Sequence, residues 1–271
     1  RQTPAVGLYD ASALQLRRTL RQDNATQRSL CCVAWSPDSR TLYFNGSIAG
    51  DQPTPLYRLA DLTQGQPTRW DVGRQQFSNM LPMPDGSVVF ATTVPSIERV
   101  DAGGRVALRP DGSPYAVAPE NIDFHRSRRD PAAFVVAADG AAIAFESAPG
   151  RWLRADPLHA DASQVLGAAR AGAPGLTAGR RSGVARVEAS TDAFNVDTPV
   201  RVGGRALAMA GGENVRSWAV HARLPIAALG TQWRLWLVDA QARPMPGWET
   251  PPFLAAPAYH TVISEDGRWV V

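Results

Sequence analysis

The side chains of this chain that could do chemistry are its four histidines and five of its aspartates. The four histidines lie apart from one another, without the spacing of a metal-binding pair: His125, His159, His221 and His260. Five aspartates could supply a carboxylate pair for hydrolysis, although nothing in their spacing brings two of them together: Asp123, Asp139, Asp156, Asp192 and Asp197. Because aspartates in turns usually bond their own backbone, we expect structural roles for most of them. We predict no catalytic, cofactor-binding or metal-binding residue, and no cofactor.

The two cysteines, Cys31 and Cys32, are adjacent. Neighbouring side chains of a strand point to opposite faces, so we expect that these two thiols do not bridge each other. A zinc site would need separated cysteine pairs, and the chain has none. We therefore interpret both residues as small side chains on an inner strand.

Two further kinds of motif are weak or missing. The chain contains no Gly-x-Ser-x-Gly sequence of the kind that presents a nucleophilic serine. The pairs Gly203-Gly204 and Gly211-Gly212 lack the Gly-Lys-Ser/Thr ending of a phosphate-binding loop. We interpret both pairs as turns that connect strands.

The elements that must position these residues follow a recurring phrase, in which an apolar run ends in a tight polar turn and a second apolar run follows. The phrase occurs at residues 33–44, 80–90, 134–145, 218–229 and 261–271. Its turns are of the Asp-Gly kind and its flanking runs are β-branched and aromatic, which predicts a β-hairpin. A repeat of about 40 to 50 residues built from short strands is typical of the blades of a β-propeller. We predict an all-β, WD-repeat-like propeller.

The phrases divide the chain into blade-sized segments. Full blades are expected at residues 30–71, 77–108 and 122–158, and a regular one returns at 215–250. Residues 160–217 are the least regular stretch, and we interpret them as a degraded blade with one long insertion, because long structureless loops are uncommon inside compact domains. Residues 1–271 are then one propeller domain of about five to six blade equivalents, either a partial ring or a seven-bladed ring with incomplete terminal blades.

The two ends of the sequence fall inside repeats. Residues 5–20 form two strands around a polar turn at residues 10–12 and resemble the outer half of a blade, whereas residues 258–271 supply only an inner half. The two halves could complete one blade between them, or the chain could be truncated. We favour truncation.

Several segments resemble a known family. Residues 28–38 look like the start of a WD-repeat blade, and residues 195–207 resemble a stretch of bacterial WD-repeat propellers that are fused to a caspase-like peptidase. As in that family, an Arg-Ser phrase at 216–220 and the segment 229–239 follow in order, and residues 262–268 also fit. The fourth phrase departs from the pattern because it has lost its Asp-Gly turn, and the Trp-Asp dipeptide occurs once, at Trp70-Asp71.

The resemblance implies an accessory propeller, because the peptidase chemistry of that family sits in a separate domain with a nucleophilic cysteine and a histidine. No Gln-Ala-Cys-x-Gly motif of that kind is present in this chain. The sequence therefore favours a non-catalytic module for protein interaction or sensing. The alternatives are a propeller hydrolase or lyase with its site in the central channel, and a sensor of sugar or peptide ligands. The apolar inner strands favour binding.

The amino-acid composition limits the classes of partner that we expect. All 28 basic residues are arginine, which is typical of a GC-rich bacterial genome, and the net charge is only +3. The basic clusters are short and scattered, so we predict a protein or peptide partner and no nucleic acid. No apolar run reaches the length of a membrane span, and we leave open whether the protein is cytoplasmic or exported.

The tryptophans are the strongest candidates for contacts with a partner. Trp35, Trp218 and Trp269 fall within the repeated phrases and are expected to pack between blades. Four others fall in outer strands or rims, where a tryptophan can be an interaction hot spot: Trp152, Trp233, Trp236 and Trp248.

Overall fold

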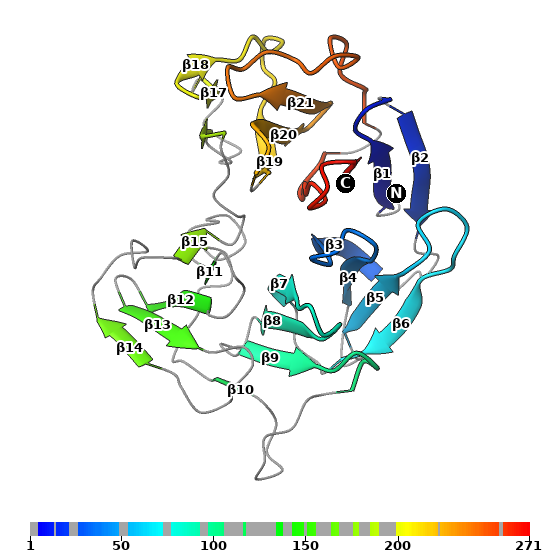
Figure 1. The fold of residues 1–271 in the computed structure, drawn as a ribbon, viewed down its shortest axis with the longest axis vertical. Helices are drawn as coiled ribbons and strands as arrows, with labels where there is room; N and C mark the ends of the chain where they lie inside the picture. The colour runs from blue at the N-terminus through cyan, green and yellow to red at the C-terminus, as the bar shows by residue number, and fades with distance from the viewer. Residues whose placement is uncertain are drawn as a thin grey trace. The chain divides into compact units, whose positions relative to one another are not determined.

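The computed structural model describes most of the chain, and its described part is all-β (Figure 1). The described residues are 5–13, 15–21, 27–48, 54–72, 77–92, 97–105, 116–117, 134–137, 143–148, 151–155, 164–167, 176–178, 185–189, 199–221, 223–254 and 257–271. For residues 27–31, 46–48, 77–79, 91–92, 97 and the strands between 116 and 178, the description covers the backbone only. The described residues contain no helix, and their strands form six antiparallel sheets.

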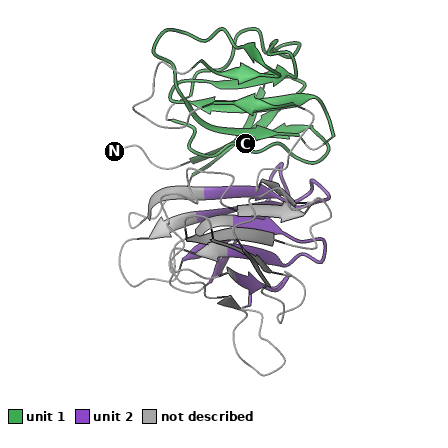
Figure 2. Ribbon diagram, turned by 90° about the vertical axis from the view of Figure 1, so that its left-hand side faces the viewer, with its two compact units in different colours: residues 1–24, 182–271 green, residues 25–181 purple. Residues whose placement is uncertain are grey.

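The chain divides into two compact units, one of residues 1–24 and 182–271 and one of residues 25–181 (Figure 2). Unit 2 contains three sheets whose strands mostly follow chain order, as in a blade, which is a small antiparallel sheet of successive strands. The first is β3(Gln27–Trp35), β4(Leu42–Ile48), β5(Pro55–Leu59) and β6(Thr68–Asp71). The second is β7(Phe77–Pro82), β8(Val88–Thr92), β9(Ile97–Val100) and β10(Ala116–Val117). The third is β11(Phe134–Ala137), β12(Ile143–Ala148), β13(Arg151–Ala155) and β14(Gln164–Gly167), with β15(Leu176–Ala178) on the other side of β11.

Unit 1 also contains three sheets. Short strands make the first, which consists of β16(Val187–Glu188), β17(Arg201–Val202) and β18(Arg205–Ala206). The second is β19(Val215–Val220), β20(Ile226–Thr231) and β21(Leu235–Asp239). The third has the order β2(Gln15–Arg21), β1(Ala5–Asp10) and β22(Trp269–Val270).

All five repeated phrases are hairpins, and the all-β prediction is confirmed. In four phrases the first residue pairs with the last: Val33 with Phe44, Met80 with Phe90, Phe134 with Phe145 and Trp218 with Leu229. In the fifth, Val262 and Val271 exchange both backbone hydrogen bonds, at 2.9 and 3.0 Å. The single propeller domain, its blade number and its ring form stay predictions.

Two hairpin turns that lie far apart in the sequence have the same pattern of internal hydrogen bonds. The Ser36 hydroxyl donates to Asp38 at 2.6 Å and accepts from the Thr41 N–H at 2.9 Å. The Ser264 hydroxyl donates to Asp266 at 2.5 Å and accepts from the Trp269 N–H at 2.9 Å. In each turn the residue after the aspartate has a positive φ, 60° at Ser39 and 72° at Gly267. A side chain that bonds the backbone of its own turn favours that turn locally.

Buried side chains pack the sheets of each unit together. In unit 2, Tyr43, Leu56 and Trp70 pack with Met80 and Phe90 of the next sheet. In unit 1, one cluster joins the 185–207 region to β19–β21, and a second joins β1 and β22 to the β20–β21 hairpin and Trp248. Among the residues whose side chains are described, the first two sheets of unit 2 therefore bury apolar faces against each other, and so do neighbouring sheets of unit 1.

The prediction for the irregular segment 160–217 is met in part. A short three-stranded sheet forms where a degraded blade was expected, with Ala185, Val202 and Leu207 buried. Strand β15 instead pairs antiparallel with β11 of the preceding sheet, although residues 160–217 were expected to be a degraded blade with one long insertion.

The two ends of the sequence pair, although we favoured truncation over this alternative. Tyr9 and Asp10 of β1 pair with Val270 and Trp269 of β22, and the Ala11 N–H donates to the Arg268 carbonyl at 2.8 Å. The outer strands from the start of the sequence and the inner hairpin from its end thus form one sheet. The pairing buries Trp248, whose indole N–H donates to the Ala11 carbonyl at 2.7 Å.

The expectation for the cysteines is wrong, because Cys32 is disulfide-bonded and the described residues include no free cysteine. The expectation assumed a regular strand. The β3–β4 register shifts between Leu30 and Val33, and the Cys32 N–H donates to the Asn45 side chain at 3.0 Å. A bulge of this kind breaks the alternation of faces on which the expectation depended.

Candidate protein-interaction surface

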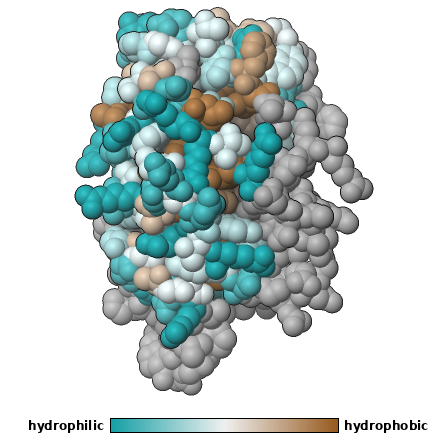
Figure 3. All heavy atoms as spheres, turned by 90° about the vertical axis from the view of Figure 1, so that its right-hand side faces the viewer, coloured by the Kyte–Doolittle hydropathy of each residue, from teal (hydrophilic) through white to brown (hydrophobic). Residues whose placement is uncertain are grey.

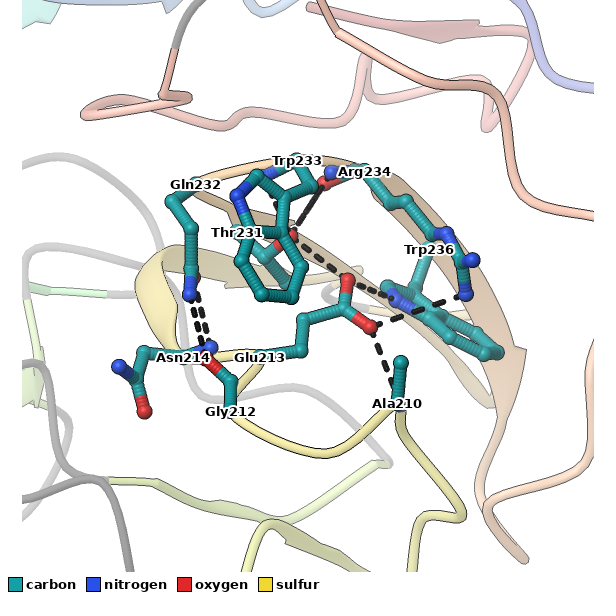
Figure 4. A network of polar contacts seen from close by, with 9 residues as sticks. All are labelled: Ala210, Gly212, Glu213, Asn214, Thr231, Gln232, Trp233, Arg234 and Trp236. Carbon is teal, nitrogen blue, oxygen red and sulfur yellow. Dashed lines mark hydrogen bonds and ion pairs between the residues drawn. The ribbon is translucent and has the colours of Figure 1, made fainter.

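One end of the β19–β21 sheet is built on a buried carboxylate. Glu213 lies in the turn that precedes β19, and its side chain has no exposed surface. Its carboxylate accepts hydrogen bonds from the Thr231 hydroxyl at 2.7 Å, the Trp236 indole N–H at 3.0 Å and the Ala210 N–H at 3.3 Å (Figure 4). All of these groups are donors, as an acceptor-only carboxylate requires. Glu213 therefore ties the start of β19 to the turn between β20 and β21.

The turn at residues 231–234 is held by its own side chains as well. The Thr231 hydroxyl accepts from the backbone N–H groups of Trp233 and Arg234, at 3.1 and 2.8 Å. Gln232 accepts from the Asn214 N–H at 2.6 Å and donates to the Gly212 carbonyl at 2.7 Å, which fastens the turn to the loop that carries Glu213 (Figure 4). The backbone here is consequently fixed in place before any partner arrives.

Three aromatic side chains lie exposed on this base. Trp233 is 42% exposed, Phe253 72% and Tyr259 65%. The segments that carry the last two are pinned to the same turn, because the Leu254 N–H donates to the Trp233 carbonyl at 2.6 Å and the Ala258 N–H to the Thr231 carbonyl at 3.0 Å. We name this surface the aromatic end, defined by Trp233, Arg234, Phe253 and Tyr259.

Arg234 gives the aromatic end a positive charge. Its guanidinium carbon lies 4.7 Å from the centre of the Phe253 ring, and its Nη1 lies 3.8 Å from Glu213 Oε2, within ion-pair range but beyond hydrogen-bonding distance. Its side chain is 25% exposed, and its Nε has no hydrogen-bond partner. The guanidinium thus keeps donors that the fold does not use.

The structure places the tryptophans predicted for the rim in different environments. Of the four rim candidates, Trp233 is exposed, whereas Trp236 is 6% exposed and Trp248 is fully buried. The side chain of Trp152 lies outside the described residues. Among the tryptophans expected to pack between blades, Trp35 and Trp269 are buried and Trp218 is half-buried against its unit's core.

Sequence reasoning missed Phe253 and Tyr259. Both lie in the proline-rich segment 249–260, which carries no repeat phrase and so offered no periodicity to analyse. An aromatic residue in a segment without a strand pattern was the available signal.

The remaining candidates have structural roles or lie outside the described residues. His221 is buried, and its Nδ1 accepts from the Arg223 and Leu224 N–H groups at 3.0 and 2.8 Å while its Nε2 contacts the Glu265 carbonyl at 2.9 Å. Its place in its turn matches that of Ser36 and Ser264. His125, His159 and the five candidate aspartates lie outside the described residues, and His260 is half-buried.

The described part of the chain also bears on metal binding and on membrane spans. Its residues form no group of three or more His, Cys, Asp or Glu side chains placed to hold a metal ion. None of its segments is a helix long and apolar enough to cross a membrane.

Outside the aromatic end, polar side chains dominate what can be seen of the surface. On the face that Figure 3 shows, most described residues are hydrophilic and hydrophobic ones form smaller patches. The other exposed large hydrophobic side chains among the described residues are Leu16 on β2 and Leu224 in the turn at the opposite end of β20. The aromatic end is thus set apart because three such side chains lie on segments that backbone hydrogen bonds join.

Comparisons with known proteins identify no family. No protein-family model and no curated protein matches the chain. One similar solved structure is the C-terminal WD40 domain of Sif2, 12% identical with a TM-score of 0.49, over 93% of this chain and 81% of that one. Another is the β-propeller domain of Myceliophteria thermophila Cps50 (Swd1), 12% identical with a TM-score of 0.43, over 98% of this chain and 89% of that one. The description of the sheets as blades rests on the hairpins and strand orders of this chain.

Proposed function

We propose that this protein is an interaction module that binds peptide segments of partner proteins through the aromatic end of unit 1. The observation that carries the proposal is that Trp233, Phe253 and Tyr259 lie on segments joined by backbone hydrogen bonds. They are three of the five large hydrophobic side chains exposed among the described residues. Tryptophan, tyrosine and arginine are the residues most enriched among interface hot spots. Exposed apolar groups gathered in one place commonly mark a binding site.

The base beneath the aromatic end supports the same proposal. The hydrogen bonds of Glu213, Thr231 and Gln232 hold the turn and its neighbouring loop in one arrangement. A surface that is already ordered loses little conformational entropy when a partner binds. A loop end positioned by a rigid sheet is also where binding residues are usually found.

The test is a selection from a random peptide library on the whole chain, followed by titration of the selected peptides against variants. Trp233→Ala and Phe253→Ala should each weaken binding by about tenfold or more, as hot-spot truncations do. Leu16→Ala and Leu224→Ala are matched controls, because they remove exposed apolar side chains of 47% and 41% exposure elsewhere on unit 1. These two variants should leave affinity unchanged.

Two results would contradict the proposal. One is a library that yields no peptide at all. The other is a set of peptides whose affinity responds to Leu16→Ala or Leu224→Ala but not to the aromatic variants. Circular dichroism and thermal melts of each variant show whether the fold is retained before its affinity is interpreted.

A finer proposal concerns the longer protein to which the chain would belong. The ordered resemblance of residues 195–207, 216–220, 229–239 and 262–268 to propellers fused with caspase-like peptidases supports an accessory role beside such a peptidase domain. In that arrangement the propeller senses or positions substrate for the peptidase. Sequencing the complete gene tests this role, because the reading frame should also encode a domain with a cysteine–histidine pair.

A further inference from the structure

We infer that the aromatic end accepts an acidic peptide segment, whose carboxylates pair with Arg234 and Arg216 while its apolar side chains contact the exposed rings. This inference rests on the proposed function and names the chemistry of the partner. It comes from the charges at this end of unit 1 and from the hydrogen-bond donors that the fold leaves unused.

The exposed side-chain charge at this end is positive. Residues 210–216, 231–234, 252–254 and 257–260 include one carboxylate, Glu213, and two arginines, Arg216 and Arg234. The Glu213 side chain has no exposed surface, and its oxygens already accept three hydrogen bonds. A partner therefore meets cationic side chains at this end and no exposed carboxylate from these segments, which favours an acidic segment over a basic one.

Arg234 is poised to bind a carboxylate. A guanidinium carries five N–H donors in a planar fork that matches a carboxylate. In Arg234, the unpaired Nε is buried, so the Nη groups are the donors that a partner can reach. The side chain is 25% exposed, and Nη1 lies 3.8 Å from Glu213 Oε2, beyond hydrogen-bonding distance. The Phe253 ring beside it, at 4.7 Å, limits the rotamers of the guanidinium, so less entropy is lost when it pairs.

Arg216 is the second cation at the same end of the sheet. The β19–β20 register shifts between Val215 and Ser217, which leaves Arg216 as the extra residue of a bulge opposite Gly230 and Thr231. Bulges of this kind re-aim a side chain and are frequent beside binding sites. The Arg216 side chain is half-buried and its Nε is inaccessible, so a partner would meet this guanidinium at its terminal Nη groups.

The probes are three fluorescein-labelled molecules of equal length, each titrated against the whole chain by anisotropy. The first is a twelve-residue peptide of alternating glutamate and phenylalanine, the second replaces every glutamate with lysine, and the third is a single-stranded oligothymidine. The acidic peptide should bind about tenfold or more tightly than the lysine peptide, and raising the salt from about 0.05 to about 0.5 M should narrow that gap.

Variants locate the preference. Arg234→Gln and Arg216→Gln should each reduce affinity for the acidic peptide by about fivefold to tenfold and leave the lysine peptide unaffected. Arg205→Gln is the matched control, because Arg205 is an exposed arginine of unit 1 on β18, outside the segments of the aromatic end. If Arg234→Gln fails to fold, Arg216→Gln and the salt titration still decide the question.

The outcomes separate this inference from the proposed function. Peptides that bind through Trp233 and Phe253 with no preference for glutamate over lysine would overturn the acidic partner and leave the interaction module standing. Oligothymidine that binds more tightly than the acidic peptide would also overturn it, since arginines beside exposed rings suit a nucleic acid too. No binding of any library peptide would overturn both.

Discussion

At the scale of the residue, Glu213 connects the segments that form the base of the aromatic end. It is a buried carboxylate whose three hydrogen-bond donors come from three different parts of unit 1, a turn, a strand end and a strand. Few single side chains in the described part of the chain connect so many elements. The exposed rings depend on it indirectly, because the turn that carries Trp233 is fastened to the loop that carries Glu213.

We expect Glu213→Ala to lower the free energy of unfolding by about 3 kcal/mol, because it leaves buried donors and a nearby arginine without their acceptor. Denaturant unfolding followed by circular dichroism measures this loss. Peptide affinity should fall with it, since the turn loses its anchor. Glu249→Ala is the control, because Glu249 is exposed and should change stability by less than about 0.5 kcal/mol. A loss below about 1 kcal/mol for Glu213→Ala would show that the network does not hold the turn.

Asp38 makes the free energy of unfolding depend on pH in the acidic range. The Ser36 hydroxyl, and after it the Arg40 N–H, lower the pKa of Asp38 below its ordinary value of 3.8. The unfolded chain then binds a proton more readily than the folded one, so this contribution is fully present above the ordinary pKa. It is lost as the pH falls below 3.8 and through the folded-state pKa.

We expect Ser36→Ala to move the pKa of Asp38 back towards the ordinary aspartate value, because the hydroxyl that donates to the carboxylate is gone. Proton-detected titration of the Asp38 carboxyl by NMR measures the change. Thr19→Ala, on the exposed face of β2, should leave it where it was. An unaltered pKa in Ser36→Ala would mean that the backbone N–H groups alone set it.

At the scale of the element, two glycines in turns allow the cost of backbone strain to be compared with the cost of steric overlap. Gly104 and Gly204 both have positive φ, 81° and 77°, in turns between strands. A Cβ at Gly104 would overlap the indole ring of Trp70, whereas a Cβ at Gly204 would meet nothing within 4 Å. The two positions thus differ mainly in what surrounds them.

We expect Gly204→Ala to cost about 1 kcal/mol of stability, the usual penalty for a side chain at positive φ. Gly104→Ala should cost about 2 kcal/mol more, because Trp70 is part of the unit 2 core and must move. Equilibrium unfolding of both variants provides the comparison. Equal losses would mean that Trp70 moves aside without cost.

The hairpins show how one turn geometry tolerates different chemistry. Ser36 and Ser264 close their turns through an aspartate, while His221 takes the same place with its Nδ1 and reaches the next hairpin through its Nε2. The hydrogen bonds that His221 Nδ1 accepts explain how the fourth phrase keeps its hairpin after losing its Asp-Gly turn. A ring nitrogen supplies the acceptor that the aspartate would have supplied.

At the scale of the whole molecule, the start of the sequence completes a sheet of unit 1. Residues 1–21 supply β1 and β2, and Tyr9 and Ala11 pack with Trp248 and Val270. We expect a chain without residues 1–21 to expose Trp248, which should lower the melting temperature and red-shift the tryptophan fluorescence. Adding residues 1–21 back as a separate peptide should restore hydrogen-exchange protection in 262–271. If the shortened chain melts like the whole one, the pairing contributes no stability.

The hairpins could be read from the sequence because they depend on neighbours in the chain. An Asp-Gly or Asp-Ser turn between β-branched runs specifies its own hydrogen bonds, so the pairs Val33–Phe44 and Met80–Phe90 were predictable. The same locality explains the two strands around Asp10, whose carboxylate accepts from the Ser12 N–H and hydroxyl.

Other features depend on residues that meet only when distant segments pack. Trp233, Trp236 and Trp248 look alike in the sequence, yet only Trp233 is exposed, because Trp236 turns toward Glu213 and Trp248 packs under Ala11. The Cys32 disulfide followed from a bulge, and the pairing of β1 with β22 joins residues from opposite ends of the sequence. Local turn chemistry acts over a few residues and is written in the sequence, whereas burial is a property of the neighbours that folding brings together.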